Sequence, residues 1–333
     1  DEEHDSSFKQ YDPAPRYNAR DAAIVLANIF KAKVVLGTAT PSIESIHNVH
    51  KDKYGLVELK ERYGGLALPK IEIIDLRKEV QVGKVKQISQ PLSEGIANAL
   101  QNEEQVILFQ NRRGYSPIYH CHSCGWSQKC INCDVNLTYH KYFERLNCHY
   151  CGHNENLPDT CPACGSHGLE LKGFGTERIE DELSTLFPEA RTHRLDLDTV
   201  RSKYAYEKII HQFENKAIDI LIGTQMITKG LDFEHVSLVG VLSADMLMAY
   251  PDFRSAERAF QLMMQVAGRP GRVHKQGLVM IQTYQPDHRI IHHLRHSSHA
   301  QFIKEELAER KAFKYPPFER LIKISVKHKK TDT

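Results

Sequence analysis

Apolar runs alternate with amphipathic stretches along most of this chain, and their order predicts a parallel α/β sheet. Continuous apolar runs are typical of strands covered on both faces, and they occur at 33–36, 105–110 and 236–242. Apolar residues three and four positions apart predict helices at 20–31, 92–100, 177–186, 201–214 and 254–267. Because strands alternate with helices of this length, the fold class is α/β.

Shorter patterns extend this prediction to the rest of the chain. Further strands are expected at 55–59, 71–75, 192–195, 219–222 and 277–283. A short helix is expected at 42–49, because Pro41 stands near its start. Residues 77–90 are charged and lack periodicity, which predicts a linker. Beyond residue 287, a histidine-rich helix, a helix at 300–313 and a strand at 321–326 predict a connector into another domain.

All eight cysteines of the 333-residue chain fall within one stretch, as four Cys-x-x-Cys pairs. Two thiolates three positions apart can face one ion from a tight turn, so two pairs form a tetrahedral Cys₄ site. This spacing is typical of structural zinc, and eight thiolates fill two closed sites. We therefore predict two Zn²⁺ ions per chain, held by Cys121, Cys124, Cys130, Cys133, Cys148, Cys151, Cys161 and Cys164.

Other interpretations of the cysteine-rich stretch have less support. Disulfides are typical of secreted chains, and the first residues do not resemble a signal peptide. An iron–sulfur cluster also takes four cysteines, although paired turns at this spacing favour zinc. Eight thiolates already close two sites, so we expect no ligand role for the neighbouring histidines, which are His120, His122, His140, His149 and His153. Spacing alone does not decide whether the pairs combine in nested or sequential order.

Composition is that of an ordinary soluble globular protein, with 41% hydrophobic and 26% charged residues. No apolar run is long enough to span a bilayer, so we expect no membrane partner. The net charge of +2 means that any basic surface for nucleic acid must be local. Free thiols without a targeting segment predict a cytoplasmic protein. The chain opens on Asp1 and ends after a predicted strand, so we expect a fragment of a longer protein.

Several polar segments at predicted strand ends suit phosphate chemistry. In the acidic cluster DEEH at 1–4, an aspartate can hold Mg²⁺ and a glutamate can orient the attacking water. Segments GTATPS at 37–42 and DILIGTQMITKGLDF at 219–233 supply hydroxyl, lysine and acidic side chains. Segment QVAGRPGR at 265–272 places two arginines three residues apart, which can clamp a transferring phosphate. Without these companions, the acidic cluster would be interpreted as a solvated turn.

The order of these motifs resembles motifs II to VI of the superfamily 2 helicases. The cysteine pairs between NRRGY and GFGTE, together with DEEHDSSFKQ, YNARD and GTERIEDEL, resemble the primosomal helicases with which bacteria restart replication. The resemblance covers essentially the whole chain. It implies the end of a first motor lobe at 1–80 and a RecA-like second lobe at 81–118 and 172–287. A zinc-binding module is inserted into the second lobe at 119–171, and a connector helix with the start of a C-terminal domain follows at 288–333.

The resemblance also implies roles for single residues. Asp1 corresponds to the Mg²⁺-linked acid, and Glu2 to the acid that activates water. Gly230 and Asp232 correspond to a motif that contacts nucleotide and couples it to DNA. The nucleotide-sensing glutamine and the arginine fingers correspond to Gln265, Arg269 and Arg272. In the family the zinc pairs nest, so one ion would bind Cys121, Cys124, Cys161 and Cys164, and the other Cys130, Cys133, Cys148 and Cys151.

The activity implied for the whole protein is ATP-dependent 3′→5′ unwinding of DNA at stalled or abandoned forks, which nucleates primosome assembly. The implied partners are branched and single-stranded DNA, other primosome proteins, the loader of the replicative helicase and the single-stranded DNA-binding protein. The phosphate-binding loop Gly-x₄-Gly-Lys-Ser/Thr is absent from these 333 residues, because the Gly83-Lys84 dipeptide is followed by Val85. We therefore expect no ATP hydrolysis by the fragment alone. Pro270 stands where the family usually has alanine, and it stiffens the turn between the arginines.

Aromatic and basic residues follow the acidic cluster and predict contact with DNA. Rings beside cations can stack on bases and contact phosphates, and the candidates are Phe8, Lys9, Tyr11 and Tyr17. Packing of the rings against the motor is the alternative. In the family, a similar loop couples DNA binding to ATP hydrolysis.

Two other functions compete with a DNA helicase. One is a zinc-stabilised binding module without an enzymatic cycle. Such a scaffold has no reason to keep Gln265, Arg269 and Arg272 together with Asp1 and Glu2. The other is a superfamily 2 motor that acts on RNA, against which the cysteine-rich stretch argues through the resemblance.

Overall fold

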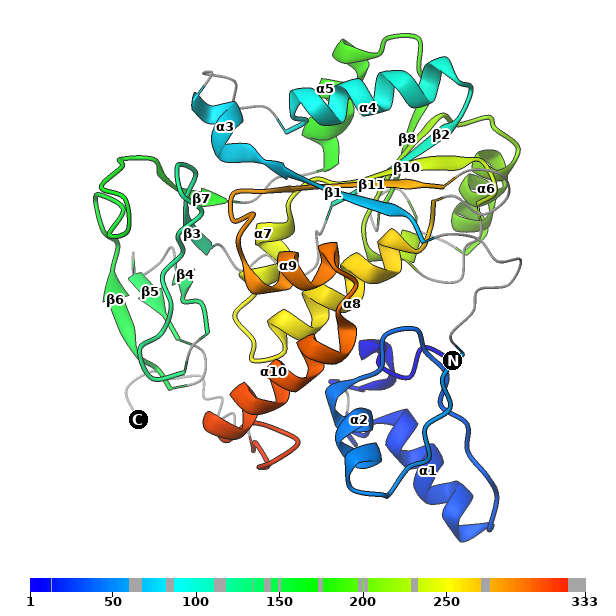
Figure 1. Cartoon of the computed structure of the whole chain (residues 1–333), viewed down its shortest axis with the longest axis vertical. Helices are drawn as coiled ribbons and strands as arrows, with labels where there is room; N and C mark the ends of the chain where they lie inside the picture. The colour runs from blue at the N-terminus through cyan, green and yellow to red at the C-terminus, as the bar shows by residue number, and fades with distance from the viewer. Residues whose placement is uncertain are drawn as a thin grey trace. The chain divides into compact units, whose positions relative to one another are not determined.

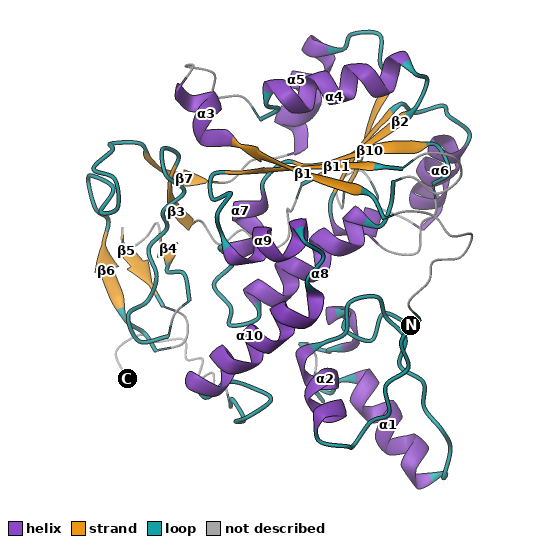
Figure 2. Ribbon diagram, in the orientation of Figure 1, coloured by secondary structure: helices purple, strands orange, loops and turns teal. Residues whose placement is uncertain are grey.

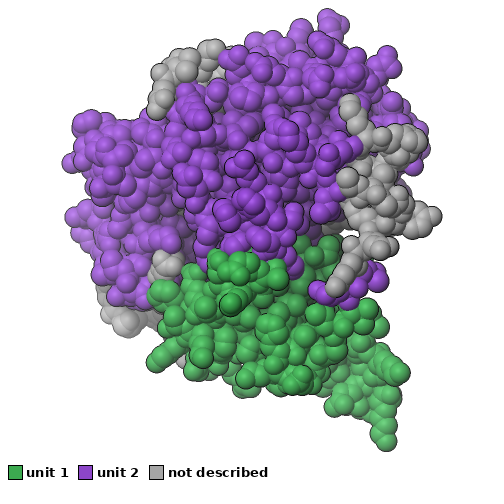
Figure 3. All heavy atoms as spheres, in the orientation of Figure 1, with its two compact units in different colours: residues 1–57, 300–333 green, residues 58–299 purple. Residues whose placement is uncertain are grey.

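A computed structural model describes residues 1–12, 14–59, 68–81, 87–110, 118–133, 135–140, 145–148, 151–172, 176–196, 200, 203–228, 233–270 and 276–322. The chain divides into two compact units, residues 1–57 with 300–333 and residues 58–299 (Figure 3). We describe each unit separately.

A six-stranded parallel sheet forms the centre of the larger unit (Figures 1 and 2). From one edge to the other its strands are β1 (Lys70–Asp75), β11 (Leu278–Thr283), β10 (Val236–Val241), β2 (Gln105–Phe109), β9 (Ile220–Gly223) and β8 (Thr192–Leu195). Every residue of β2 and β9 is buried, as their continuous apolar sequences predict. The α/β fold class and the parallel sheet are therefore confirmed.

Helices cover both faces of this sheet (Figure 1). On one face, α4 (Gln90–Gln101) and α5 (Thr176–Leu186) bury Leu92, Ile96 and Leu183 against the strands. On the other face lie α7 (Ala244–Met248), α8 (Ser255–Ala267) and α9 (Arg289–Arg295). Other described helices of the unit are α3 (Leu76–Gln81), α6 (Lys203–Glu214) and the 3₁₀ helix η3 (Gln225–Thr228).

Two buried glutamines of the larger unit have hydrogen-bond partners for their side-chain amides. The amide of Gln105 donates to the carbonyl oxygens of Phe213 and Ile218, both at 2.7 Å. Gln282 on β11 accepts from the N–H of Ser89 at 2.8 Å and donates to the Leu242 carbonyl at 3.0 Å. These bonds tie the start of α4 and the end of β10 to β11. Because an unpaired buried amide would be costly, they also fix the register of these segments.

A small cysteine-rich module interrupts the sequence between β2 and α5. Its entering and leaving segments pair as an antiparallel ribbon of β3 (Ile118–Cys121) and β7 (Leu169–Lys172). Between them, a second sheet consists of β4 (Thr138–His140), β5 (Arg145–Asn147) and β6 (Asn154–Asn156). The buried core of the module consists of Val135, Leu137, Leu146 and two cysteines. Such a core is too small to stabilise a domain alone.

The smaller unit contains η1 (Ser6–Phe8), α1 (Ala19–Ile29) and α2 (Ile43–His50), and most of α10 (His299–Ala312) falls in its residue range. The strands predicted at 33–36 and 55–59 are absent, and these described residues have no regular structure. Val35 is 90% exposed and Val57, in the second predicted strand, is 87% exposed. A doubly covered strand needs neighbours on both sides, and the described residues of this unit form no sheet that could supply them. Those two predictions were therefore wrong for this structure.

Other differences concern boundaries. The predicted linker at 77–90 instead contains α3 and the first residue of α4. Strand β1 lies within the predicted range 1–80, yet it pairs with β11 in the larger unit. The strand expected at 321–326 falls mostly outside the described residues, and Leu321 and Ile322 are not in a strand. The division into functional domains stays a prediction. No helix in the described ranges is both long and apolar enough to cross a membrane.

The N-cap of α9 predicts a pH-dependent stability. The ring of His288 accepts from the N–H of Ile290 at 3.3 Å, which requires an unprotonated Nδ1. Burial, and then the charges of Arg289 and Lys129, lower the pKa of His288 to about 4. As the pH falls below about 6.5, His288 becomes protonated in the unfolded chain but stays neutral in the folded chain. The contribution of His288 to the free energy of unfolding therefore declines toward pH 4.

We expect the His288→Asn variant, which keeps an N-cap acceptor, to lose less stability between pH 7 and pH 5 than the parent. The difference should be about 2 kcal/mol in the free energy of urea unfolding. Zinc release in acid is common to both proteins and cancels in the comparison. Equal pH dependence of the two proteins would contradict the assignment.

Candidate functional site

The third acid of the cluster, Glu3, is the buried centre of the N-terminal turn. It is 4% exposed. Its carboxylate accepts from the N–H of Ser42 at 2.6 Å and from the hydroxyls of Ser42 and Ser45, both at 3.0 Å. Arg20 on α1 donates to the same carboxylate at 2.7 Å. Glu3 thus joins residues 1–4 to the segment GTATPS and to α1.

The two acids with predicted catalytic roles lie in the same turn and reach solvent. Asp1 is exposed, and the side chain of Glu2 is 36% exposed. The hydroxyl of Thr38 donates to Glu2 at 3.1 Å, and its oxygen lies 2.9 Å from Nδ1 of His4. The backbone of Glu2 has a left-handed φ of 50°, which residues other than glycine rarely adopt. Glu2 is therefore held toward solvent by the GTATPS segment while Glu3 anchors the turn.

The predicted DNA-contacting residues lie on a loop between this turn and α1. Phe8 ends η1 and is half-buried, whereas Tyr11 and Tyr17 are 63% and 49% exposed. Lys9 donates through Nζ to the carbonyl of Arg16 at 2.8 Å, which closes the loop. Two rings are thus available to a ligand, while Lys9 contributes to the shape of the loop.

The predicted nucleotide residues of the larger unit lie at the end of α8. Gln265 occupies the last turn of α8, and Arg269 follows it; both are half-buried. Pro270 packs on Gly277, where a Cβ would lie 2.5 Å from the Cβ of the proline. Gly230, Asp232 and Arg272 fall outside the described residues. Asp1 and Glu2 belong to the smaller unit.

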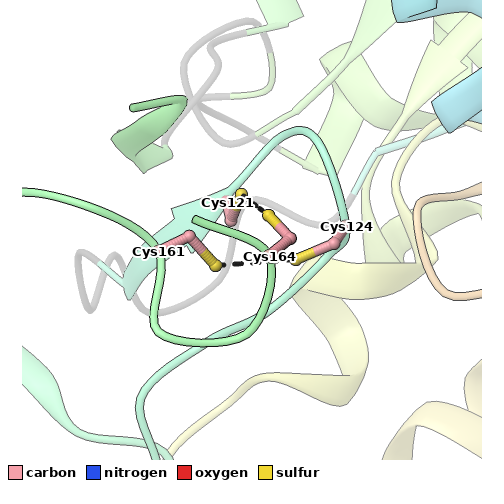
Figure 4. Close-up of side chains that lie close together, drawn as sticks. All are labelled: Cys121, Cys124, Cys161 and Cys164. Carbon is pink, nitrogen blue, oxygen red and sulfur yellow. Dashed lines mark hydrogen bonds between the residues drawn. The ribbon is translucent and has the colours of Figure 1, made fainter. Parts of the chain in front are cut away.

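The eight cysteines form two groups of four, in nested order. We call Cys121, Cys124, Cys161 and Cys164 quartet one, and Cys130, Cys133, Cys148 and Cys151 quartet two. Within each quartet all sulfur atoms lie within 4.8 Å of one another, and no disulfide is formed. In quartet one, sulfur pairs approach to 3.6 and 3.7 Å (Figure 4). In quartet two, Cys130 and Cys151 approach to 3.5 Å.

These separations and the local backbone suit zinc. With Zn–S bonds of about 2.3 Å, the sulfur atoms of a tetrahedral site lie about 3.8 Å apart. The first cysteine of every pair donates its N–H to the carbonyl five residues later, and the distances are 2.7 or 2.8 Å in all four turns. Each turn thus presents two thiols to one point. The donor set and its geometry fit two closed Cys₄ sites, as predicted.

Protonation of the thiols depends on their surroundings. Burial raises the pKa of Cys124, Cys130 and Cys133, whereas a hydrogen bond from the backbone N–H of His153 lowers the pKa of Cys151 to about 6. A quartet without a cation therefore cannot hold four thiolates at neutral pH. Zn²⁺, when bound, supplies the charge that stabilises them. Both groups that the described residues form consist of cysteines alone. The expected lack of a ligand role for the neighbouring histidines stays a prediction.

Sequence reasoning missed two features of these sites. Glycines follow the second cysteine in three of the pairs, and Gly125, Gly152 and Gly165 have φ values of 81°, 74° and 71°. Each donates its N–H to the first cysteine of its turn at 2.8 to 3.0 Å. The Cys-x-x-Cys-Gly pattern could have revealed these turns. No local pattern distinguishes the buried Glu3 from its acidic neighbours.

Comparison with known proteins agrees with both parts of the larger unit. Residues 130–155 match the model of the PriA DNA helicase Cys-rich region domain, and residues 176–274 match the helicase conserved C-terminal domain. The first match contains quartet two. The second match includes strands β8, β9 and β10 of the sheet and helix α8.

Close relatives align with almost the whole chain. The replication restart protein PriA of Bacillus subtilis is 45% identical over 98% of this chain and 41% of the relative. The Synechocystis protein of that name is 43% identical over 97% of this chain and 40% of the relative. That of Haemophilus influenzae is 43% identical over 98% and 45%. The chain thus spans less than half the length of these three relatives.

The buried ion pair of the N-terminal turn gives a stability prediction. The Arg20→Met variant would leave the Glu3 carboxylate buried without its cation, and breaking one side of such a pair costs about 3 kcal/mol. Urea unfolding monitored by circular dichroism should show this loss. The matched Arg16→Met variant removes an exposed arginine from the loop that precedes α1 and should change stability by less than about 0.5 kcal/mol. Equal effects of the two substitutions would contradict the role of Glu3.

Proposed function

This chain is a homologue of the PriA replication restart proteins over two fifths to one half of their length, and we propose that it is part of an ATP-dependent 3′→5′ DNA helicase. The whole protein would act at stalled or abandoned replication forks and nucleate primosome assembly. One observation carries the proposal: two nested Cys₄ quartets interrupt a parallel sheet whose following residues match a helicase C-terminal domain.

The acidic turn would serve ATP hydrolysis. Asp1 is exposed and suited to hold Mg²⁺, and Glu2 is held toward solvent, where it could orient the attacking water. Because Thr38 bonds to Glu2 and Ser42 bonds to Glu3, a shift of the GTATPS segment would move both carboxylates. This linkage offers a route by which DNA contact elsewhere could alter the geometry of hydrolysis.

Residues of the larger unit would also have roles in nucleotide handling. We assign nucleotide sensing to Gln265, charge neutralisation to Arg269 and Arg272, and coupling to Gly230 and Asp232. Two guanidinium groups that contact the transferring phosphate would stabilise charge in the transition state. The sequence lacks a Gly-x₄-Gly-Lys-Ser/Thr loop, so these 333 residues should not hydrolyse ATP alone. Mg²⁺ and ATP are therefore proposed for the full-length protein.

The zinc-containing protein would bind DNA at replication forks in the cytoplasm. The exposed rings of Tyr11 and Tyr17, together with Phe8 and Lys9 of the same loop, suit single-stranded DNA, because aromatic faces stack on bases of any sequence. Branched DNA, other primosome proteins, the loader of the replicative helicase and the single-stranded DNA-binding protein are the proposed partners. A zinc-stabilised binding module without an enzymatic cycle is the alternative, which the two Cys₄ quartets would serve equally well.

An assay of DNA-stimulated ATP hydrolysis by the full-length protein separates these two functions. A helicase should hydrolyse ATP faster when forked DNA is added, and it should unwind a duplex that has a 3′ overhang in preference to one that has a 5′ overhang. A binding module would bind the same DNA without hydrolysis. Absence of stimulated hydrolysis would reject the helicase proposal.

The aromatic loop gives a sharper prediction. In the full-length protein, Phe8→Ala should lower DNA-stimulated ATP hydrolysis by about tenfold and leave hydrolysis without DNA unchanged, because stacking contributes about 1–3 kcal/mol. Phe8→Leu keeps an apolar side chain without an aromatic face and separates stacking from packing. Phe313→Ala, which removes a 44% exposed ring from a distant part of the sequence, serves as the control. Unchanged stimulation in the Phe8→Ala protein would contradict the coupling role.

A further inference from the structure

The turn that carries Cys121 and Cys124 touches the residues that follow strand β11. The side-chain amide of Gln285 donates to the carbonyl oxygen of Gly125 at 2.8 Å. A Cβ on Gly125 would lie 2.5 Å from Cγ of Gln285 and 3.1 Å from the carbonyl oxygen of Tyr284. Two backbone segments, far apart in sequence, therefore approach as closely as a glycine permits.

A second contact joins the same two segments. His120 directly precedes Cys121 and is buried. Its ring meets the ring of Tyr284 edge to face, with centroids 5.3 Å apart and planes at 68°. Tyr284 is buried as well. Residues on both sides of the cysteine pair thus hold the end of β11.

The end of β11 is in turn joined to the start of helix α7. The carboxylate of Asp245 accepts from the N–H of Tyr284 at 3.1 and 3.2 Å, and from the hydroxyl of Thr283 at 2.9 Å. Asp245 is 1% exposed. A carboxylate this deeply buried depends on its donors, so its position follows that of Tyr284. Contacts therefore run without a break from quartet one to the segment that follows β10.

Quartet two is supported differently. Cys130 and Cys148 pack with Val135, Leu137 and Leu146 inside the module. These residues belong to the second sheet, or lie beside it. The described contacts that surround quartet two thus come from within the module, from β4, β5 and β6, from residues beside them and from Tyr119 of β3.

We propose that quartet one is a positioning element of the six-stranded sheet, whereas quartet two stabilises only its own small sheet. Zinc in quartet one fixes the turn at Gly125, which holds Tyr284 and Gln285 and, through them, Asp245. The consequence for a motor rests on the proposed function, but the structural coupling does not. Zinc loss from quartet one would thus reach the sheet, and zinc loss from quartet two would not.

A matched pair of variants tests the coupling on this chain. Cys164 and Cys151 are the exposed cysteines of their respective quartets, so Cys164→Ser and Cys151→Ser each remove one ligand with little loss of packing. Each variant should retain about one zinc. Hydrogen–deuterium exchange at 278–285 and 244–248 should rise about tenfold in Cys164→Ser and remain unchanged in Cys151→Ser. Exchange at 138–156 should rise in Cys151→Ser.

Two results would overturn the proposal. One is unchanged exchange at 278–285 in a Cys164→Ser protein that has lost one zinc. The other is an equal rise at 278–285 in both variants. The experiment uses neither ATP nor DNA, so its failure is distinguishable from failure of the helicase proposal.

A third variant keeps all eight cysteines and guards against misfolding of the serine variants. Gln285→Ala removes the donor to Gly125, and both zincs should remain bound. One of the two should then transfer to a chelator several-fold faster, while the other keeps the rate of the parent. The only tryptophan, Trp126, accepts at its carbonyl oxygen from the N–H of Cys121 at 2.8 Å, so its fluorescence should respond to release from quartet one. The Cys164→Ser and Cys151→Ser proteins, each with one remaining ion, show which release the signal reports. Unaltered release of both ions would count against the coupling.

Discussion

Four thiols that converge on one point are the constraint on which the larger unit depends. Each quartet brings its sulfur atoms within 4.8 Å, and four thiolates at that distance repel one another unless a divalent cation lies among them. The module around them buries few apolar side chains, so metal binding supplies much of its folding free energy. Because quartet one also contacts the end of β11, the same ion contributes to the order of the central sheet.

Burial sorts the three neighbouring acids into different roles. Glu3 is buried and fully bonded to Ser42, Ser45 and Arg20, so it serves structure. Glu2 and Asp1 face solvent from the same turn and remain available to a metal ion and a water molecule. A buried anchor beside two exposed carboxylates gives a turn that is both rigid and accessible. Catalysis of phosphate transfer depends mainly on positioning, so the roles proposed for Asp1 and Glu2 would rely on this arrangement.

Much of the sheet was predictable from sequence, because apolar periodicity reports directly on burial. The strands at 105–110 and 236–242 appear as expected, as does the helix at 254–267. The prediction of a strand at 33–36 was wrong because an apolar run shows only that its side chains favour burial. It does not show that adjacent strands are present to pair with it. The ligands of both metal sites followed from spacing, whereas nested pairing required the resemblance. The roles of Glu3 and Gln285 depend on contacts between distant segments and had no local pattern.

Metal analysis of the purified chain tests the account most directly, because the two Cys₄ sites underlie both the fold of the module and the proposed function. Elemental analysis should find about two zinc ions and no iron per chain. It should be done on protein that was never exposed to chelators, with zinc and iron counted in the same sample. Iron in place of zinc, or folded protein without metal, would contradict the account.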